Sequence, residues 1–415
     1  MKKKRIVVII TSVLLVFAIA AQMTFCAAKI QAKDLMKDIT PNPVEPMKDL
    51  SEQNPQATDF AVRLLQASEE SGKNTLISPL SVMSALSMTA NGAKGETLSQ
   101  MENVLGMTLD ELNLYLYSYV GQLPQGDKYK LSVANSLWVT EKDSFTVNRE
   151  FLQINADYYG ADVYQAPFTQ ETSRDINKWV KQNTDGMVEK IVEDVPADAI
   201  MYLVNALAFD AEWMEIYEKD QVRNGTFTKE DGSEQSVDFM HCSEHEYLED
   251  ENATGFMKRY RGGYAFVALL PKEGISVSEY VASLDGEALH TMLSEPQSAR
   301  VYTSIPKFET GYEVDMGEIL SDMGMPKAFD PNHADFQEIG TADGIIYIDE
   351  VLHKTFISVG EKGTRAGAAT VVEMKSGSAI VEKTKEVHLN RPFVYMLIDC
   401  ENYVPFFIGT MMDVG

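Results

Sequence analysis

The stretch Glu361–Glu386 decides how this chain is interpreted, and its sequence is EKGTRAGAATVVEMKSGSAIVEKTKE. It separates two segments of strand composition, Thr355–Val359 and Phe393–Asp399. A connection this long with so few anchoring apolar residues is uncommon in a compact domain, and such segments usually carry function. The stretch is therefore the first candidate for a functional element.

Within this stretch, the residues from Thr364 to Ser376 alternate in character. The uncharged set is Thr364, Ala366, Ala368, Thr370, Val372, Met374 and Ser376, and the set between them, which holds every charge, is Arg365, Gly367, Ala369, Val371, Glu373 and Lys375. Because a strand points alternate side chains to opposite faces, this segment as a strand would have one small uncharged face and one face suited to water. The alternative is a flexible Ala/Gly-rich loop whose alternation is accidental.

The segments around this stretch predict one α+β domain. From about Ala57 onward the chain has no low-complexity linker and no fixed-period repeat. Apolar spacing and a Ser-Pro start predict helices at 59–65, 78–88 and 175–182. Strand composition predicts strands at Leu131–Thr140, Ile200–Phe209, Tyr264–Leu270, Val301–Ile305, Thr355–Val359, Phe393–Asp399 and Phe406–Thr410. Helices that come early and strands that come late indicate an α+β fold built around large sheets.

The composition is that of an acidic globular protein. Hydrophobic residues make up 45% and charged residues 24% of the chain, and 36 Lys+Arg against 62 Asp+Glu give a formal net charge of -26. A body this acidic repels phosphate backbones, so the sequence predicts no nucleic-acid partner.

Residues 1–28 have the pattern of a secretory signal peptide. Basic residues at the start precede an apolar run that ends at Ala21, and small residues follow it. Cleavage after Ala20, Ala21 or Ala28 predicts a secreted, extracellular protein. Two alternatives stay open: the run is kept as an N-terminal membrane anchor, although it is short for a core of about 30 Å, or Cys26 carries a lipid that holds a lipoprotein at the cell surface.

Between this leader and a domain spanning 55–415, residues 29–54 are predicted to be a flexible tether. The segment is polar and is interrupted by Pro41, Pro43 and Pro46. Once the leader is removed, two cysteines remain in the chain, which is too few for a disulfide framework. The domain is therefore expected to depend on its apolar core.

The sequence contains no assembled catalytic motif. His241 and His245 have a spacing that could place two imidazoles one helical turn apart, but their flanks are acidic and hydrophilic and no third ligand cluster follows, so a solvated loop is predicted. No Gly-x-Ser-x-Gly elbow, phosphate-binding loop or dinucleotide fingerprint occurs. The prediction is a protein that is not an enzyme and has no cofactor and no metal; a secreted hydrolase is a weak alternative.

Eight short motifs occur in order through the body, and each resembles a landmark of the serpin family. They are Asn74–Ser81, Gly92–Thr97, Ala134–Trp138, Tyr158–Ala161, Ile176–Val180 with Thr184–Gly186, Leu203–Ala206 with Trp213, Ile305–Phe308 and Arg391–Tyr395. Glu361–Thr364, followed by the Ala/Gly-rich run, resembles the proximal hinge of an inhibitory serpin. The chain is thus similar to a secreted, bacterial-like serpin of the inhibitory type.

The resemblance implies a serpin fold of about eight or nine helices around three β-sheets, with an exposed reactive loop, about 361–386, near the C-terminus. It also implies a metastable native state whose main sheet is one strand short. A protease that cuts the loop forms an acyl-enzyme, and the freed hinge inserts as a new strand before the acyl bond is hydrolysed. The implied function is irreversible, suicide-substrate inhibition of serine proteases.

The resemblance also assigns roles to particular residues. The implied hinge is Glu361, Lys362, Gly363, Thr364, Arg365, Ala366, Gly367, Ala368, Ala369 and Thr370, and the implied sheet-opening cluster is Ser78, Asn205 and His353. The family's usual spacing selects Gly377–Ser378 as the reactive bond. Because 378–391 is longer than is common in the family, Ala379, Ile380 and Val381 stay open as cleavage positions. Arg365 departs from the family's frequent acidic or polar residue, and its outward parity makes it tolerable.

The residues around the implied bond predict the class of target. Lys375–Val381 contains small and aliphatic residues, no aromatic residue, and a single basic residue at its start. Because trypsin-like pockets prefer Arg or Lys and chymotrypsin-like pockets a large ring, elastase-like or subtilisin-like serine proteases are predicted, with cysteine proteases as a second class of partner. A monomer is expected. The alternative is a non-inhibitory serpin-fold binding protein or a plain protease substrate, which charged residues or prolines at the inward positions would favour; the sequence has neither there.

Overall fold

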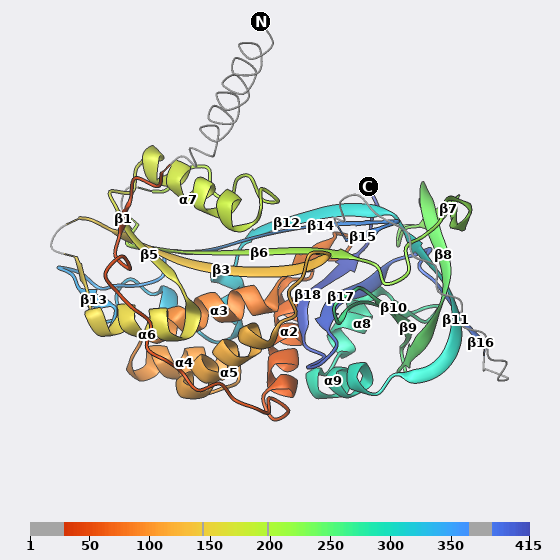
Figure 1. The fold of residues 1–415 in the computed structure, drawn as a ribbon, viewed down its shortest axis with the longest axis horizontal. Coiled ribbons are helices and arrows are strands. Elements are labelled where there is room, and N and C mark those ends of the chain that lie inside the picture. Colours follow the sequence, from red (N-terminus) through yellow and green to blue (C-terminus); the bar gives the residue numbers. More distant parts are fainter. Residues whose placement is uncertain (1–28, 143–144, 197–198, 365–383) are drawn as a thin grey trace, which may run out of the picture.

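The computed structural model describes residues 29–142, 145–196, 199–364 and 384–415. Within these ranges the chain forms nine α-helices and three β-sheets (Figure 1). The helices are α2 (Asn54–Ser68), α3 (Pro79–Ala90), α4 (Gly95–Leu105), α5 (Leu109–Gln122), α6 (Arg149–Tyr159), α7 (Gln170–Asn183), α8 (Val277–Ser283), α9 (Gly286–Ser294) and α10 (Gly317–Met323), with short 3₁₀ helices at Lys219–Gln221 and Pro326–Phe329.

A seven-stranded sheet, here called the central sheet, has the order β1-β5-β3-β6-β15-β14-β12. Its strands are β1 (Lys33–Asp34), β3 (Tyr129–Thr140), β5 (Asp162–Ala166), β6 (Met201–Glu212), β12 (Phe308–Asp315), β14 (Glu350–Gly360) and β15 (Gly363–Thr364). In Figure 1 the long strands β3, β6, β12 and β14 run along the length of the molecule, with α7 on one face and α2 to α6 on the other. Trp138, Tyr164, Trp179 and Tyr202 fill the space between α7 and the sheet.

The second sheet has nine strands, in the order β16-β11-β8-β9-β10-β17-β18-β2, with β7 paired to β8. They are β2 (Thr75–Ile77), β7 (Val222–Thr228), β8 (Glu234–Glu249), β9 (Ala253–Arg259), β10 (Tyr264–Pro271), β11 (Gln297–Pro306), β16 (Thr384–His388), β17 (Phe393–Asp399) and β18 (Pro405–Met411); β4 (Thr146–Val147) and β13 (Gly340–Thr341) form the third, small sheet. Strands β10, β17 and β18 are buried along their whole length, so they anchor the core.

The helix α3 lies beneath the central sheet, and its start follows from three residues. Ser78 caps the helix by accepting a hydrogen bond from the backbone N–H of Ser81 at 3.3 Å, and Pro79 occupies the first helical position, where no intrahelical N–H is needed. Every residue of α3 is buried, which explains why its sequence contains no charged residue and only the small polar residues Ser and Thr.

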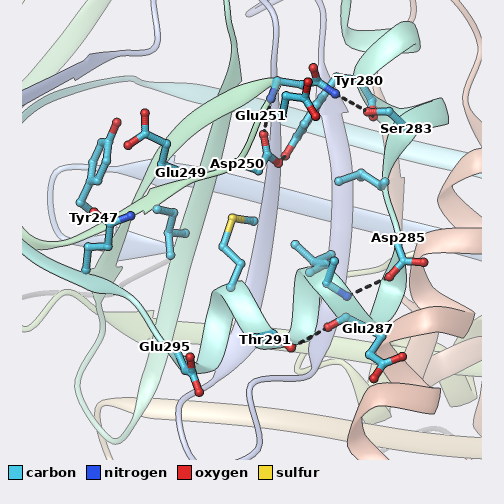
Figure 2. A pocket seen from close by; sticks show the side chains of 17 residues that line it. Tyr247, Glu249, Asp250, Glu251, Tyr280, Ser283, Asp285, Glu287, Thr291 and Glu295 are labelled. Carbon is cyan, nitrogen blue, oxygen red and sulfur yellow. Dashed lines mark hydrogen bonds between the residues drawn. The ribbon is translucent and has the colours of Figure 1, made fainter.

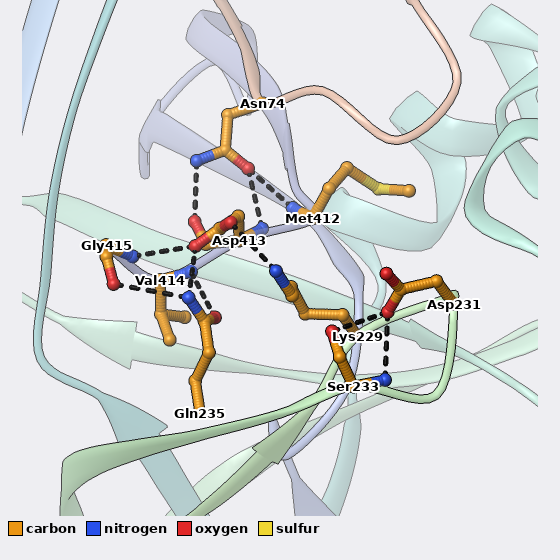
Figure 3. Close-up of polar contacts among 9 residues, drawn as sticks. All are labelled: Asn74, Lys229, Asp231, Ser233, Gln235, Met412, Asp413, Val414 and Gly415. Atoms are coloured by element: carbon orange, nitrogen blue, oxygen red, sulfur yellow. Dashed lines mark hydrogen bonds and ion pairs between the residues drawn. The ribbon is translucent and has the colours of Figure 1, made fainter.

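The C-terminal end of the chain is held by a network of side chains (Figure 3). The Asn74 carboxamide oxygen accepts hydrogen bonds from the backbone N–H groups of Met412 and Asp413, and its amide nitrogen donates to the Asp413 carbonyl oxygen at 2.6 Å. The Asp413 carboxylate accepts from Lys229 and Gln235 at the β7–β8 turn. The chain end is thereby tied to the second sheet.

Residues 29–54, predicted to be a flexible tether, instead lie against the body. Strand β1 pairs antiparallel with β5, and the Asp175 carboxylate of α7 accepts hydrogen bonds from the backbone N–H groups of Gln31 and Ala32 at 2.7 and 2.8 Å. Leu50 is buried in the main core. Single apolar side chains and backbone hydrogen bonds fix this segment, and they leave no periodic pattern in the sequence.

The predicted α+β fold with eight or nine helices and three sheets is confirmed, and each predicted helix or strand overlaps an element of the structure. One local prediction is wrong: His241 and His245 lie within strand β8 and not in a loop. Because a strand rises about 3.3 Å per residue, His241 and His245 lie about 13 Å apart. They therefore cannot bind one metal ion together, as two histidines one helical turn apart could. Among the described helices, none is both long and apolar enough to cross a membrane.

Candidate functional site: the hinge and the parted central sheet

The two middle strands of the central sheet, β6 and β14, are paired with each other at one end only. Their parallel register joins Tyr202–Val204 to Glu350–Leu352. At the other end, β15 separates them, pairing antiparallel with both. Between these two regions lie six residues of each strand, a length of about 20 Å, in which the described pairings do not join β6 to β14. The central sheet is therefore open along its middle.

Gly363 and Thr364, the two hinge residues in β15, are already part of the sheet. Gly363 pairs with Glu212 and Gly360, and Thr364 pairs with Ala211 and Val359. Thr364 is only 2% exposed, and its hydroxyl shares a hydrogen bond with the hydroxyl of Tyr260. The side chain of Thr364 therefore lies on the buried side of the central sheet.

Two aromatic residues from the segment that follows β6 form hydrogen bonds with the hinge backbone. The Trp213 indole N–H donates to the Gly360 carbonyl oxygen and its backbone N–H to the Lys362 carbonyl oxygen, both at 2.8 Å. The Tyr217 backbone N–H donates to the Glu361 carbonyl oxygen at 2.9 Å. A hollow of about 750 Å³ borders this part of the hinge, which gives the chain room to move.

Two sets of ion pairs flank the hinge. Glu361 bonds to Lys307 at 2.8 Å, and this hydrogen bond lowers the pKa of the Glu361 carboxyl. On β6, the buried Glu212 carboxylate lies 2.8 Å from both Lys128 and Arg261. Burial raises the pKa of Glu212, but these two cations outweigh that effect and lower it overall, so the carboxylate is charged.

The structure brings the predicted sheet-opening cluster together beneath the parted strands. The Ser78 backbone N–H donates to His353 Nε2 at 3.1 Å. Asn205 joins through two residues that sequence reasoning missed: the Ser81 hydroxyl donates to the Asn205 carboxamide oxygen, and the Asn205 amide donates to the Asn135 oxygen. The cluster therefore links α3 to β3, β6 and β14.

His353 in this cluster is neutral at ordinary pH. It is 4% exposed, and burial lowers the pKa of its imidazole to about 4. Its Nε2 accepts the hydrogen bond from Ser78 and so carries no proton. Protonation would place an unpaired charge directly under the opening between β6 and β14.

The other predicted site residues lie outside the described part of the chain. These are the hinge positions Arg365, Ala366, Gly367, Ala368, Ala369 and Thr370 and the candidate cleavage positions Gly377, Ser378, Ala379, Ile380 and Val381, with Cys26 in the leader. Their predicted roles stay predictions.

An acid-lined pocket of about 690 Å³ lies between the end of β8 and helices α8 and α9 (Figure 2). Two of its carboxylates serve local structure: Asp250 accepts a hydrogen bond from the Tyr280 hydroxyl at 2.8 Å, and Asp285 caps α9 by accepting from the Ala288 N–H. Within the described residues, no group of three or more His, Cys, Asp or Glu side chains is arranged to hold a metal ion.

The described part of the chain thus has three sheets, and its central sheet is open between β6 and β14, with the two residues of β15 at one end of the opening. A family model described as Serpin (serine protease inhibitor) matches residues 55–414. The chain belongs to the serpin family.

Curated relatives and solved structures agree with this assignment. An uncharacterised serpin-like protein of Methanosarcina acetivorans is 31% identical over 366 residues, covering 84% of this chain and 83% of that protein. A similar protein of Thermococcus kodakarensis is 29% identical over 369 residues, covering 85% and 84%. The thermophilic serpin tengpin in its native state matches with a TM-score of 0.88 at 46% identity, covering 92% of this chain and 100% of that one; its latent state matches with 0.78 at 42% identity, covering 91% and 100%.

Proposed function

We propose that this protein inhibits serine proteases irreversibly, by inserting its cleaved loop into the open central sheet. The observation that carries the proposal is β15: its two residues lie between β6 and β14 and begin a strand that the opening can continue. The TM-score is higher against tengpin in its native state than against its latent state, which supports a native-like arrangement of this chain.

The register of β15 fixes which residues would face which neighbours. An antiparallel strand advances one residue for each step back along its partner. Continued from Thr364, the register would place Ala366 between Phe209 and Ile357, Ala368 between Leu207 and Thr355, and Thr370 between Asn205 and His353. The hinge would therefore reach the sheet-opening cluster after six further residues.

The burial of these neighbours explains the alternation seen in the sequence. Along the opening and at β15, the buried residues of β14 are His353, Thr355, Ile357 and Val359, and their matching neighbours on β6 are buried too. Only small, uncharged side chains fit this inner face without a large penalty. The charged Arg365 would lie on the other face beside Asp210, where an opposite-charge pair is favourable.

Insertion beyond Thr370 requires the direct β6–β14 pairing to break. Tyr202–Val204 of β6 would have to lose their pairing with Glu350–Leu352 of β14 and pair with the incoming strand instead. The new strand forms hydrogen bonds on both sides, which offsets the pairing that is lost. An acyl-enzyme attached to the moving loop would be carried along the molecule by about 40 Å if the strand extends from Thr364 to Ser376.

We further propose an elastase-like or subtilisin-like serine protease as the target and secretion as the location. The small and aliphatic residues of Lys375–Val381 support the first, and the basic and apolar pattern of residues 1–28 supports the second.

The test is incubation of the protein with a panel of elastase-like, subtilisin-like, chymotrypsin-like, trypsin-like and cysteine proteases. We expect a complex with an elastase-like or subtilisin-like enzyme that survives denaturing electrophoresis, and a released C-terminal fragment beginning between Ser378 and Glu382. Cleaved protein with fully active protease throughout the panel would instead identify a non-inhibitory binding protein or a substrate. Efficient trapping after Lys375 would overturn the target class.

A further inference from the structure

A buried lysine of the second sheet lies next to the aromatic residues that bind the hinge backbone. Lys258, near the end of β9, is 3% exposed. Its ammonium bonds to Glu244 of β8 at 2.9 Å and lies 3.7 Å from the Cys242 sulfur. A fully buried lysine is rare in proteins and costs stability unless its charge is compensated, so its position needs a reason.

The ammonium also faces the two aromatic residues that grip the hinge. It lies 4.4 Å from the ring centroid of Tyr217 and 5.3 Å from that of Trp213, within the range of cation–π attraction. Trp213 in turn stacks on Tyr260, with centroids 4.1 Å apart and planes within 11°. The hydroxyl of Tyr260 bonds to Thr364 of the hinge.

Lys258 keeps its charge in this setting. Burial lowers the pKa of its ammonium, but the nearby Glu244 carboxylate more than compensates, and the pKa is raised above the usual lysine value. A desolvated cation attracts ring faces more strongly than an exposed one. The cation therefore holds both rings in place, beside the Trp213 indole N–H and the backbone N–H groups of Trp213 and Tyr217 that donate to the hinge carbonyls.

We infer that Lys258 is a positioning residue for loop insertion: by holding Trp213 and Tyr217, it keeps the start of the hinge seated between β6 and β14. This inference rests on the proposed inhibitory function for its biological consequence. A seated hinge gives insertion a paired end from which to extend. Without it, the cleaved loop must first find the opening at an entropic cost, and the acyl-enzyme has more time to hydrolyse.

The main variant is Lys258→Met combined with Glu244→Gln, so that no buried charge is left unpaired. Amide hydrogen exchange of uncleaved protein measures the seating of Gly363 and Thr364 without any protease. We expect exchange at these two amides to become about tenfold faster, which corresponds to about 1.4 kcal/mol. Lys258→Arg, which keeps a cation over the rings, should stay close to the wild type.

The chain offers a matched control on the same two strands. Arg259 forms an ion pair with Glu246 immediately beside the pair of Lys258 and Glu244. It has no aromatic partner among the residues that hold the hinge. Arg259→Met with Glu246→Gln removes a neighbouring, less buried ion pair between the same two strands and should leave exchange at Gly363 and Thr364 unchanged. Should the main variant fail to fold, Tyr217→Leu removes a ring and keeps the lysine paired, and it should also accelerate exchange.

Unchanged hinge exchange in the Lys258 variant, or equal acceleration in both double variants, would overturn the inference. The second readout is the number of inhibitor molecules consumed per protease molecule blocked, which should rise in the Lys258 variant only. If the wild-type protein blocks no protease, the proposed function fails, while the exchange experiment still decides whether Lys258 seats the hinge.

Discussion

Gly363 occupies a backbone position that a side chain could not share. Its φ is +150°, and a Cβ built there would lie 2.0 Å from the carbonyl oxygen of Ala211. A contact this short with backbone cannot be relieved by a rotamer change. The hinge can enter the sheet here because the residue is glycine, which lacks a Cβ and tolerates this φ.

Gly363→Ala should therefore expel β15 from the sheet. We expect amide exchange at residues 363 and 364 to rise about fivefold or more, because strain of this kind costs about 1–3 kcal/mol. Gly360→Ala is the matched control, since a Cβ at Gly360 meets nothing within 4 Å and should change little. Equal protection of the hinge in both variants would show that β15 tolerates the side chain.

His353 should make stability depend on pH in the mildly acidic range. Because its folded pKa of about 4 lies below the usual value of about 6.5, the unfolded chain binds the proton first as pH falls. Above about pH 6.5 His353 is neutral in both states, and the free energy of unfolding has its full value. Between about pH 6.5 and about pH 4 the free energy of unfolding decreases by about 3 kcal/mol.

Urea unfolding at a series of pH values tests this prediction. The loss between pH 6.5 and 4.5 should be smaller in His353→Gln than in the wild type, whereas His333→Gln, at an exposed position, should behave like the wild type. A wild-type curve parallel to that of His353→Gln would mean that His353 takes up its proton without disturbing the cluster.

For the hinge strand, the register allows a specific prediction, because the adjacent residues Ala368 and Ala369 would face opposite sides of the central sheet. In the extended register, Ala368 falls between Leu207 and Thr355, whereas Ala369 falls beside Lys354 on the outer face. Ala368→Glu would bury an unpaired carboxylate and should slow insertion, converting the inhibitor largely into a substrate.

Ala369→Glu should keep inhibition, because its carboxylate can meet water and Lys354. The measurement is the ratio of covalent complex to cleaved protein on denaturing gels. If the two variants behave alike, the register continued from β15 is wrong by one residue or the loop does not insert.

The N-terminal segment and α7 form a second pair of elements whose contact can be tested. Asp175 holds two backbone N–H groups of the segment, and hydrogen bonds to a charged group contribute about 1.5–3 kcal/mol each when intact. Asp175→Asn should therefore increase exchange at Gln31 and Ala32. Asp157→Asn should instead loosen Asn42, whose backbone N–H and side chain it binds, and leave Gln31 protected.

At the scale of the whole molecule, the sequence alone indicated large sheets, several helices and a candidate functional segment at 361–386. Periodicity and composition are local properties, so the strand predicted at Ile200–Phe209 overlaps β6, beginning one residue before it and ending three residues short of its end. The contacts made by Ser81 and Lys258 could not be predicted, because they join residues whose proximity depends on how the strands register. The packing of residues 29–54 was missed for the same reason.

A chain with an open central sheet should become more stable when its loop is cut. If the cleaved segment from Arg365 onward inserts, it gains backbone hydrogen bonds to β6 on one side and β14 on the other. At about 1 kcal/mol for each of roughly a dozen net bonds, and a few degrees of melting temperature per kcal/mol, the midpoint should rise by about 20 °C or more. In an ordinary protein a cut in an exposed loop leaves stability unchanged or lowers it, because the cut adds freedom to the unfolded chain.

Differential scanning calorimetry of intact and loop-cleaved protein measures this difference directly. Ala368→Glu, cleaved at the same bond, should gain much less, because its carboxylate opposes burial at the level of Leu207 and Thr355. A cleaved wild-type protein that melts at or below the intact one would contradict insertion, even if a protease were inhibited. Inhibition would then have to come from tight binding of an uncut loop, and the opening between β6 and β14 would need another explanation.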